Sequence, residues 1–118
     1  MNFSEKELRC GCAKCNKQVA HKCSRRALEA LQLLRECYGK PMPLTSAYRC
    51  AEHPVEVKKK KPGRHNEGIA FDVRIGWGRD RMKLLDLARG LGFNGVGIGN
   101  TFIHLDWREG VATCWGYD

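Results

Sequence analysis

No apolar run in this sequence approaches the roughly 20 residues that a membrane-spanning helix needs, and we expect no membrane partner. The first eight residues also lack the basic and apolar regions of a secretory signal peptide, which predicts synthesis in the cytoplasm. A composition of 42% hydrophobic and 29% charged residues excludes a mainly disordered chain. These absences leave a folded protein, and 118 residues suit one domain with a single core.

Acidic residues are the minority among the charges, with 13 against 21 basic residues and a net charge of +8. A basic balance favours encounter with polyanions such as nucleic acid, anionic lipid or acidic wall polymers, and charge alone does not choose among them. The seven cysteines are an odd number, so complete internal disulfide pairing is impossible. Without a signal peptide, reduced thiols are expected.

Hydrophobic periodicity predicts an α+β domain. Apolar residues at helical spacing predict helices over 24–38 and 80–91, and a short helical turn that Ser4 caps precedes them. Period-two alternation and β-favouring residues predict short strands at 43–48, 69–74, 96–98 and 101–107, with a hairpin turn at Gly99-Asn100. The segment 49–64, which includes the run Lys58 to Lys61, is predicted to be a long exposed loop. We expect a small, mostly antiparallel sheet with two helices on one face.

Two histidines and an aspartate are spaced so that they can bind one metal ion. His65 directly precedes the predicted strand that contains Asp72. In another predicted strand, alternation places His104 and Asp106 on the same face. Catalytic zinc sites keep three such protein ligands and leave one position open. The alternative is a surface His65, a core-edge His104 and a salt-bridged Asp72.

Three segments resemble the zinc D-Ala-D-Ala carboxypeptidase family, whose fold is shared by hedgehog signalling domains. The His-x6-Asp stretch from His65 to Asp72, with Gly68 and Ala70 between the ends, is similar to the family's first metal motif. The segments Phe102–Asp106 and Leu44–Cys50 resemble its third-ligand strand and its Ser-Gly-Tyr-Arg segment. The resemblance covers nearly the whole chain.

The resemblance implies a zinc peptidase that hydrolyses bonds at D-amino acids in peptidoglycan, with His65, Asp72 and His104 as ligands. Arg49 would bind substrate or stabilise the polarised carbonyl, and Tyr48 and Ser46 would contact the substrate. The implied partners are peptidoglycan stem peptides, and we expect a monomer that acts on the cell wall in phage lysis or as part of a virion. The sequence does not specify which peptidoglycan bond is cut.

The match departs from the family pattern at two positions. Gly63 stands where many members have serine. Thr101 stands where well-known members carry the acidic catalytic base, three residues before the third ligand, and threonine cannot act as that base. Asp106 leads as the replacement because it shares a strand face with His104, with the alternative that it orients an imidazole. Weaker candidates follow in the loops, namely Glu52, His53, Glu56 and Glu67.

The N-terminal 23 residues are rich in cysteine, and we expect this segment to pack on the peptidase domain. Four of its thiols are candidates for a second, structural zinc site: Cys10, Cys12, Cys15 and Cys23. Their irregular spacing leaves buried thiols, or disulfides formed outside the cell, as alternatives.

Two other functions remain open at this point. A wall-binding module that keeps the fold without hydrolysis would explain Thr101. A basic, cysteine-rich nucleic-acid binder is the third hypothesis, although no motif for nucleic acid accompanies the tryptophans and we expect no such partner.

Overall fold

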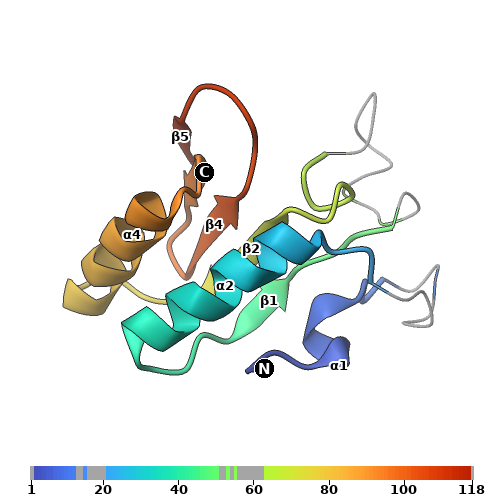
Figure 1. Cartoon of the computed structure of the whole chain (residues 1–118), viewed down its shortest axis with the longest axis horizontal. Coiled ribbons are helices and arrows are strands. Elements are labelled where there is room, and N and C mark those ends of the chain that lie inside the picture. The colour runs from blue at the N-terminus through green and yellow to red at the C-terminus, as the bar shows by residue number, and fades with distance from the viewer. Residues whose placement is uncertain are drawn as a thin grey trace.

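A five-stranded sheet forms the centre of the protein, in the order β1-β2-β4-β3-β5 (Figure 1). The computed structural model describes residues 2–12, 15, 21–50, 53, 55 and 63–117. The strands are antiparallel to their neighbours except for the parallel pair β3 and β5. Their bounds are β1 Leu44–Ser46, β2 Ala70–Arg74, β3 Gly95–Ile98, β4 Phe102–Asp106 and β5 Thr113–Gly116. The expected α+β class with a mostly antiparallel sheet is therefore confirmed.

The described helices are α1 (Glu5–Leu8), α2 (Arg25–Tyr38) and α4 (Arg79–Leu91). The helix predicted over 24–38 is confirmed as α2, which begins after the capping side chain of Ser24 and ends where Gly39 adopts a left-handed conformation. The helix predicted over 80–91 is confirmed as α4, and the Ser4-capped turn as α1. No described helix is both long and apolar enough to cross a bilayer.

Alternation along β2 and β4 divides the two faces of the sheet. Phe71 and Val73 on β2, and Ile103 and Leu105 on β4, are buried in one hydrophobic core with the apolar residues of α2 and α4. The even-numbered residues of both strands point to the opposite face. This arrangement places polar side chains on the sheet face that the two long helices do not cover.

The Gly99-Asn100 hairpin is held by the buried side chain of Arg81 on α4. Its guanidinium donates hydrogen bonds to the carbonyl oxygens of Gly99, Gly76 and Ile75 at 2.8, 2.9 and 2.6 Å. A buried guanidinium that is saturated by carbonyl groups is stable without a carboxylate partner. Arg81 thereby joins the end of β2 to the turn that begins β4.

One strand of the sheet, β5, was not predicted from the sequence, and part of one predicted loop lies outside the described residues. No prediction covered β5, because three of its four residues are exposed and it carries no alternating apolar pattern. Of the predicted loop over 49–64, the run Lys58 to Lys61 and the residues Glu52 and Glu56 lie outside the described residues.

Candidate metal centre

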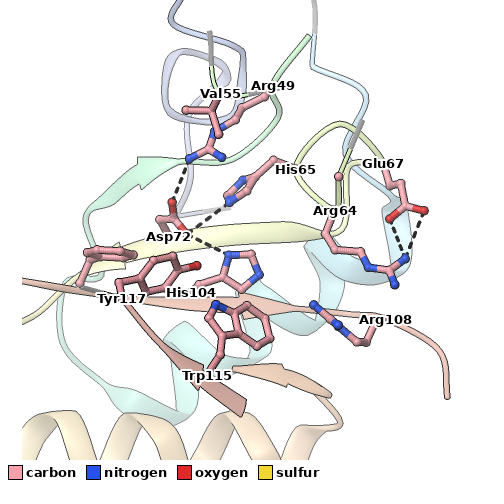
Figure 2. A pocket seen from close by; sticks show the side chains of 12 residues that line it. Arg49, Val55, Arg64, His65, Glu67, Asp72, His104, Arg108, Trp115 and Tyr117 are labelled. Atoms are coloured by element: carbon pink, nitrogen blue, oxygen red, sulfur yellow. Dashed lines mark hydrogen bonds and ion pairs between the residues drawn. The ribbon is translucent and has the colours of Figure 1, made fainter. Parts of the chain in front are cut away.

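Three buried side chains from separate elements meet on the polar face of the sheet: His65, Asp72 and His104 (Figure 2). Asp72 on β2 is the direct cross-strand partner of His104 on β4. His65 reaches them from the turn before β2, where Gly68 has a φ of 76°. A Cβ at Gly68 would overlap the Lys22 carbonyl group, so only glycine fits where this turn packs against the segment that precedes α2.

The spacing of the three side chains fits a zinc ion. His65 Nε2 lies 3.3 Å from Asp72 Oδ1, and His104 Nδ1 lies 3.1 Å from the same oxygen. Ligand atoms about 2.0–2.1 Å from a tetrahedral zinc are about 3.3 Å from one another. Both distances to Asp72 are therefore close to the separation that the metal requires, and all three ligand atoms lie within 4.8 Å of one another.

His65 offers its lone pair to this centre. Its Nδ1 lies 2.6 Å from the carbonyl oxygen of Ala47, which only accepts, so Nδ1 carries the proton and donates. In the neutral ring, which is the form that binds a metal, Nε2 is then an acceptor, and it is buried without a geometric hydrogen bond to any described residue, with Asp72 Oδ1 at 3.3 Å. A buried acceptor that faces a carboxylate oxygen requires a cation, and a metal ion meets that requirement.

His104 lies between two carboxylates, with Nδ1 toward Asp72 and Nε2 2.8 Å from Asp106 Oδ2. Burial lowers the pKa of His104, but the hydrogen bonds with Asp106 and Asp72 outweigh it and raise the pKa overall. For Asp72 the directions are reversed. Burial favours a raised pKa, but the hydrogen bonds with His104 and His65 outweigh it and hold the pKa of Asp72 well below its usual range. Asp72 is therefore an anion, the form that a metal ligand needs.

Asp106 lies behind His104 and not beside the three ligand atoms. Its carboxylate is fully buried and receives three hydrogen bonds from Arg108, two from the guanidinium at 2.7 and 2.6 Å and one from the peptide N–H at 3.2 Å, in addition to the contact with His104. A Cβ at Gly95 would overlap this carboxylate, so the glycine in β3 makes room for it. The geometry is that of a carboxylate that orients a ligating imidazole.

The predicted substrate residues Arg49, Tyr48 and Ser46 have three different surroundings. Arg49 lines the cleft, and its Nη2 lies 3.3 Å from Asp72 Oδ2. Ser46 Oγ accepts a 3.0 Å hydrogen bond from Arg49 Nε and so positions this arginine. Tyr48 is buried against a group of cysteines and is not among the described residues that line the cleft.

A cleft of about 690 Å³ opens above the three ligand residues. Its walls include three arginines, Arg49, Arg64 and Arg108, and the aromatic side chains of Phe102, Trp115 and Tyr117. A Cβ at Gly97 would lie 2.7 Å from both Trp115 and Tyr117, so this glycine lets the two side chains cross β3. Sequence reasoning assigned no cleft role to Trp115 and Tyr117, because β5 and the residue after it carry no recognisable strand pattern, or to Arg64 and Arg108.

Besides Asp72, the one carboxylate among the described cleft residues is Glu67, which pairs with Arg64 at 3.0 Å (Figure 2). Thr101 is exposed and does not line the cleft. His53 is described but is not among the lining residues, whereas Glu52 and Glu56 lie outside the described part of the chain. Glu67 is thus, apart from Asp72, the acidic residue that the described part of the cleft presents to a bound substrate.

A second group of possible metal ligands differs in one member from the predicted set. The structure brings together Cys10, Cys12, Cys15 and Cys50. Cys23 is not in this group, and its thiol instead contacts the carbonyl oxygen of Leu8 at 3.9 Å. Cys50 takes its place because the segment after β1 lies against the N-terminal segment, where Tyr48 N donates to Leu8 O at 3.0 Å.

Three buried His and Asp side chains that could hold one metal ion below an open cleft are typical of metal-dependent hydrolases, which leave one coordination position to water or substrate. A family model described as Peptidase M15 matches residues 1–106. The match spans most of the chain, which therefore belongs to the Peptidase M15 family, and the resemblance to zinc D-Ala-D-Ala carboxypeptidases is confirmed. A comparison with curated proteins finds no significant match.

Proposed function

We propose that the protein is a zinc peptidase that hydrolyses peptide bonds at D-amino acids in bacterial peptidoglycan. The observation that carries this proposal is the set of three ligand atoms at zinc spacing on the floor of a cleft, in a chain of the Peptidase M15 family. A bound zinc ion would supply Lewis-acid polarisation of the scissile carbonyl and activation of water.

The arginines of the cleft support an anionic substrate. Arg49, Arg64 and Arg108 line it, and each also contacts one carboxylate of this chain, namely Asp72, Glu67 and Asp106 in that order. Stem peptides of peptidoglycan carry carboxylates, and arginine binds a carboxylate through paired hydrogen bonds. In this proposal Arg49 anchors a substrate carboxylate or the carbonyl oxygen, and its contact with Asp72 holds it beside the ligands.

Two further side chains receive roles in the same cleft. Burial raises the pKa of Tyr117, so its hydroxyl stays protonated at neutral pH and donates to a developing oxyanion. Figure 2 shows this hydroxyl directed toward the ligand residues. Glu67 accepts the proton from the attacking water, because Asp72 is committed to the ligand set and Asp106 lies behind His104.

The proposal is tested by incubating the protein with purified peptidoglycan, after chelation and again after addition of zinc. We expect new peptide termini at D-amino acids, identified by mass spectrometry, that disappear on chelation and return with zinc. If zinc binds tightly but no fragment appears across several wall types, hydrolysis is excluded. Sedimentation of the protein with the same peptidoglycan would then favour the wall-binding module.

The Asp106→Asn variant distinguishes a positioning role from that of a catalytic base. We expect zinc affinity to fall about 10–100-fold, because asparagine is a weaker acceptor for the His104 N–H. At saturating zinc, kcat should return close to the wild-type value. A kcat that stays low when the site is fully loaded with zinc would show that Asp106 itself transfers the proton.

A further inference from the structure

Four thiols from two distant parts of the sequence converge beside β1. Cys10, Cys12 and Cys15 follow α1, and Cys50 follows β1. All four sulfur atoms lie within 4.8 Å of one another. Cys10, Cys12 and Cys50 are buried, and the ring of Tyr48 packs against them. The group is distinct from the His-Asp-His centre, with which it shares no residue.

The sulfur separations match coordination of one metal ion. Cys10 Sγ lies 3.6 Å from Cys50 Sγ, and Cys12 Sγ lies 3.5 Å from both Cys15 Sγ and Cys50 Sγ. Thiolates about 2.3 Å from a tetrahedral zinc are about 3.8 Å apart, whereas disulfide-bonded sulfurs are about 2.05 Å apart. The observed values lie close to the first distance and well beyond the second.

We propose that Cys10, Cys12, Cys15 and Cys50 bind a second zinc ion with a structural role. Four protein thiolates complete a tetrahedral shell and leave no position for substrate, which is the mark of a structural site. The bound ion links the N-terminal segment to the chain directly after Arg49.

This link would also help to position Arg49, which lines the cleft. The peptide N–H of Arg49 donates to His65 O at 3.2 Å, and Asn66 Nδ2 donates to Arg49 O at 2.9 Å. A metal ion at Cys50 therefore fixes one end of the segment that carries Arg49, and the His65 turn fixes it from the other side. Only this consequence for substrate rests on the proposed function, since metal binding by the thiols does not depend on it.

The test is the zinc content of the intact chain, purified under reducing conditions and measured by elemental analysis and native mass spectrometry. We expect two zinc ions per chain in the wild type and one in Cys50→Ser. Cys23→Ser is the matched control, because Cys23 is a partly buried thiol of the same region outside the group, and it should keep both ions.

A cobalt spectrum of His104→Ala keeps the test decisive if Cys50→Ser fails to fold. This variant retains all four thiols, and we expect one cobalt ion per chain with strong thiolate-to-cobalt charge-transfer absorption. Absence of that absorption, or four oxidised thiols in the freshly purified protein, would overturn the proposal. Neither measurement uses peptidase activity, so failure of the thiol site and failure of the proposed function remain distinguishable.

Discussion

Replacing His104 with alanine is expected to remove zinc from the cleft and to lower peptidoglycan hydrolysis by more than about 10⁴-fold. The imidazole is one of the three proposed ligands, and its loss also leaves Asp72 and Asp106 without the group that lies between them. Zinc affinity is measured by competition with a chromophoric chelator, and hydrolysis by the release of peptide termini. Circular dichroism establishes whether the variant retains its secondary structure.

The His21→Ala variant is the control for this experiment. His21 does not line the cleft, and its partly buried side chain lies 3.2 Å from the exposed carboxylate of Glu5, a contact that contributes at most about 1 kcal/mol to stability. Its zinc affinity and hydrolysis should match the wild type. A folded His104→Ala protein that still hydrolyses peptidoglycan at a rate within tenfold of the wild type would refute the ligand assignment.

The sequence was sufficient to predict the elements that carry the proposed ligands. Strand alternation requires Asp72 to point away from Phe71, and His104 away from Ile103, whatever else the chain does. Because each strand buries its apolar side against the same helices, both polar side chains are placed on the opposite face. Periodicity and local burial therefore determine which residues can meet.

The cleft walls could not be predicted in the same way. Trp115 and Tyr117 reach the cleft because β5 pairs in parallel with β3, a contact between segments with no local signal in the sequence. The cysteine group shows the same limit. Cys23 is nearer in sequence to Cys15, but the fold brings Cys50 to the site after the chain has passed through α2 and β1.

Strand alternation does not fully determine where the Asp106 carboxylate lies. The pattern places Asp106 on the same face as His104, and the 2.8 Å contact between their side chains agrees with that. It does not say on which side of the imidazole the carboxylate lies. In the structure, Asp106 meets Nε2 while Nδ1 faces Asp72, and Arg108 occupies the remaining acceptor positions. Because Asp106 lies on the side of His104 that faces away from Asp72, we propose Glu67 in its place as the acceptor of the proton.

The Glu67→Gln variant is expected to lower kcat by about 10²–10⁴-fold, with zinc content and KM close to the wild type. Glutamine has nearly the same shape but cannot accept a proton from the attacking water. The loss of the ion pair with Arg64 should change stability little, because both side chains are about half exposed. The measurement is steady-state hydrolysis of a defined stem peptide at saturating zinc.

Glu109→Gln is the matched control, since Glu109 is an exposed loop carboxylate that does not line the cleft. Its kcat should equal that of the wild type. Addition of azide or formate to Glu67→Gln offers a second readout, because a small anion that enters the space beside the substituted side chain can partly restore proton transfer. If Glu67→Gln keeps full kcat, the proton acceptor lies elsewhere, and Glu52→Gln and Glu56→Gln become the variants to measure.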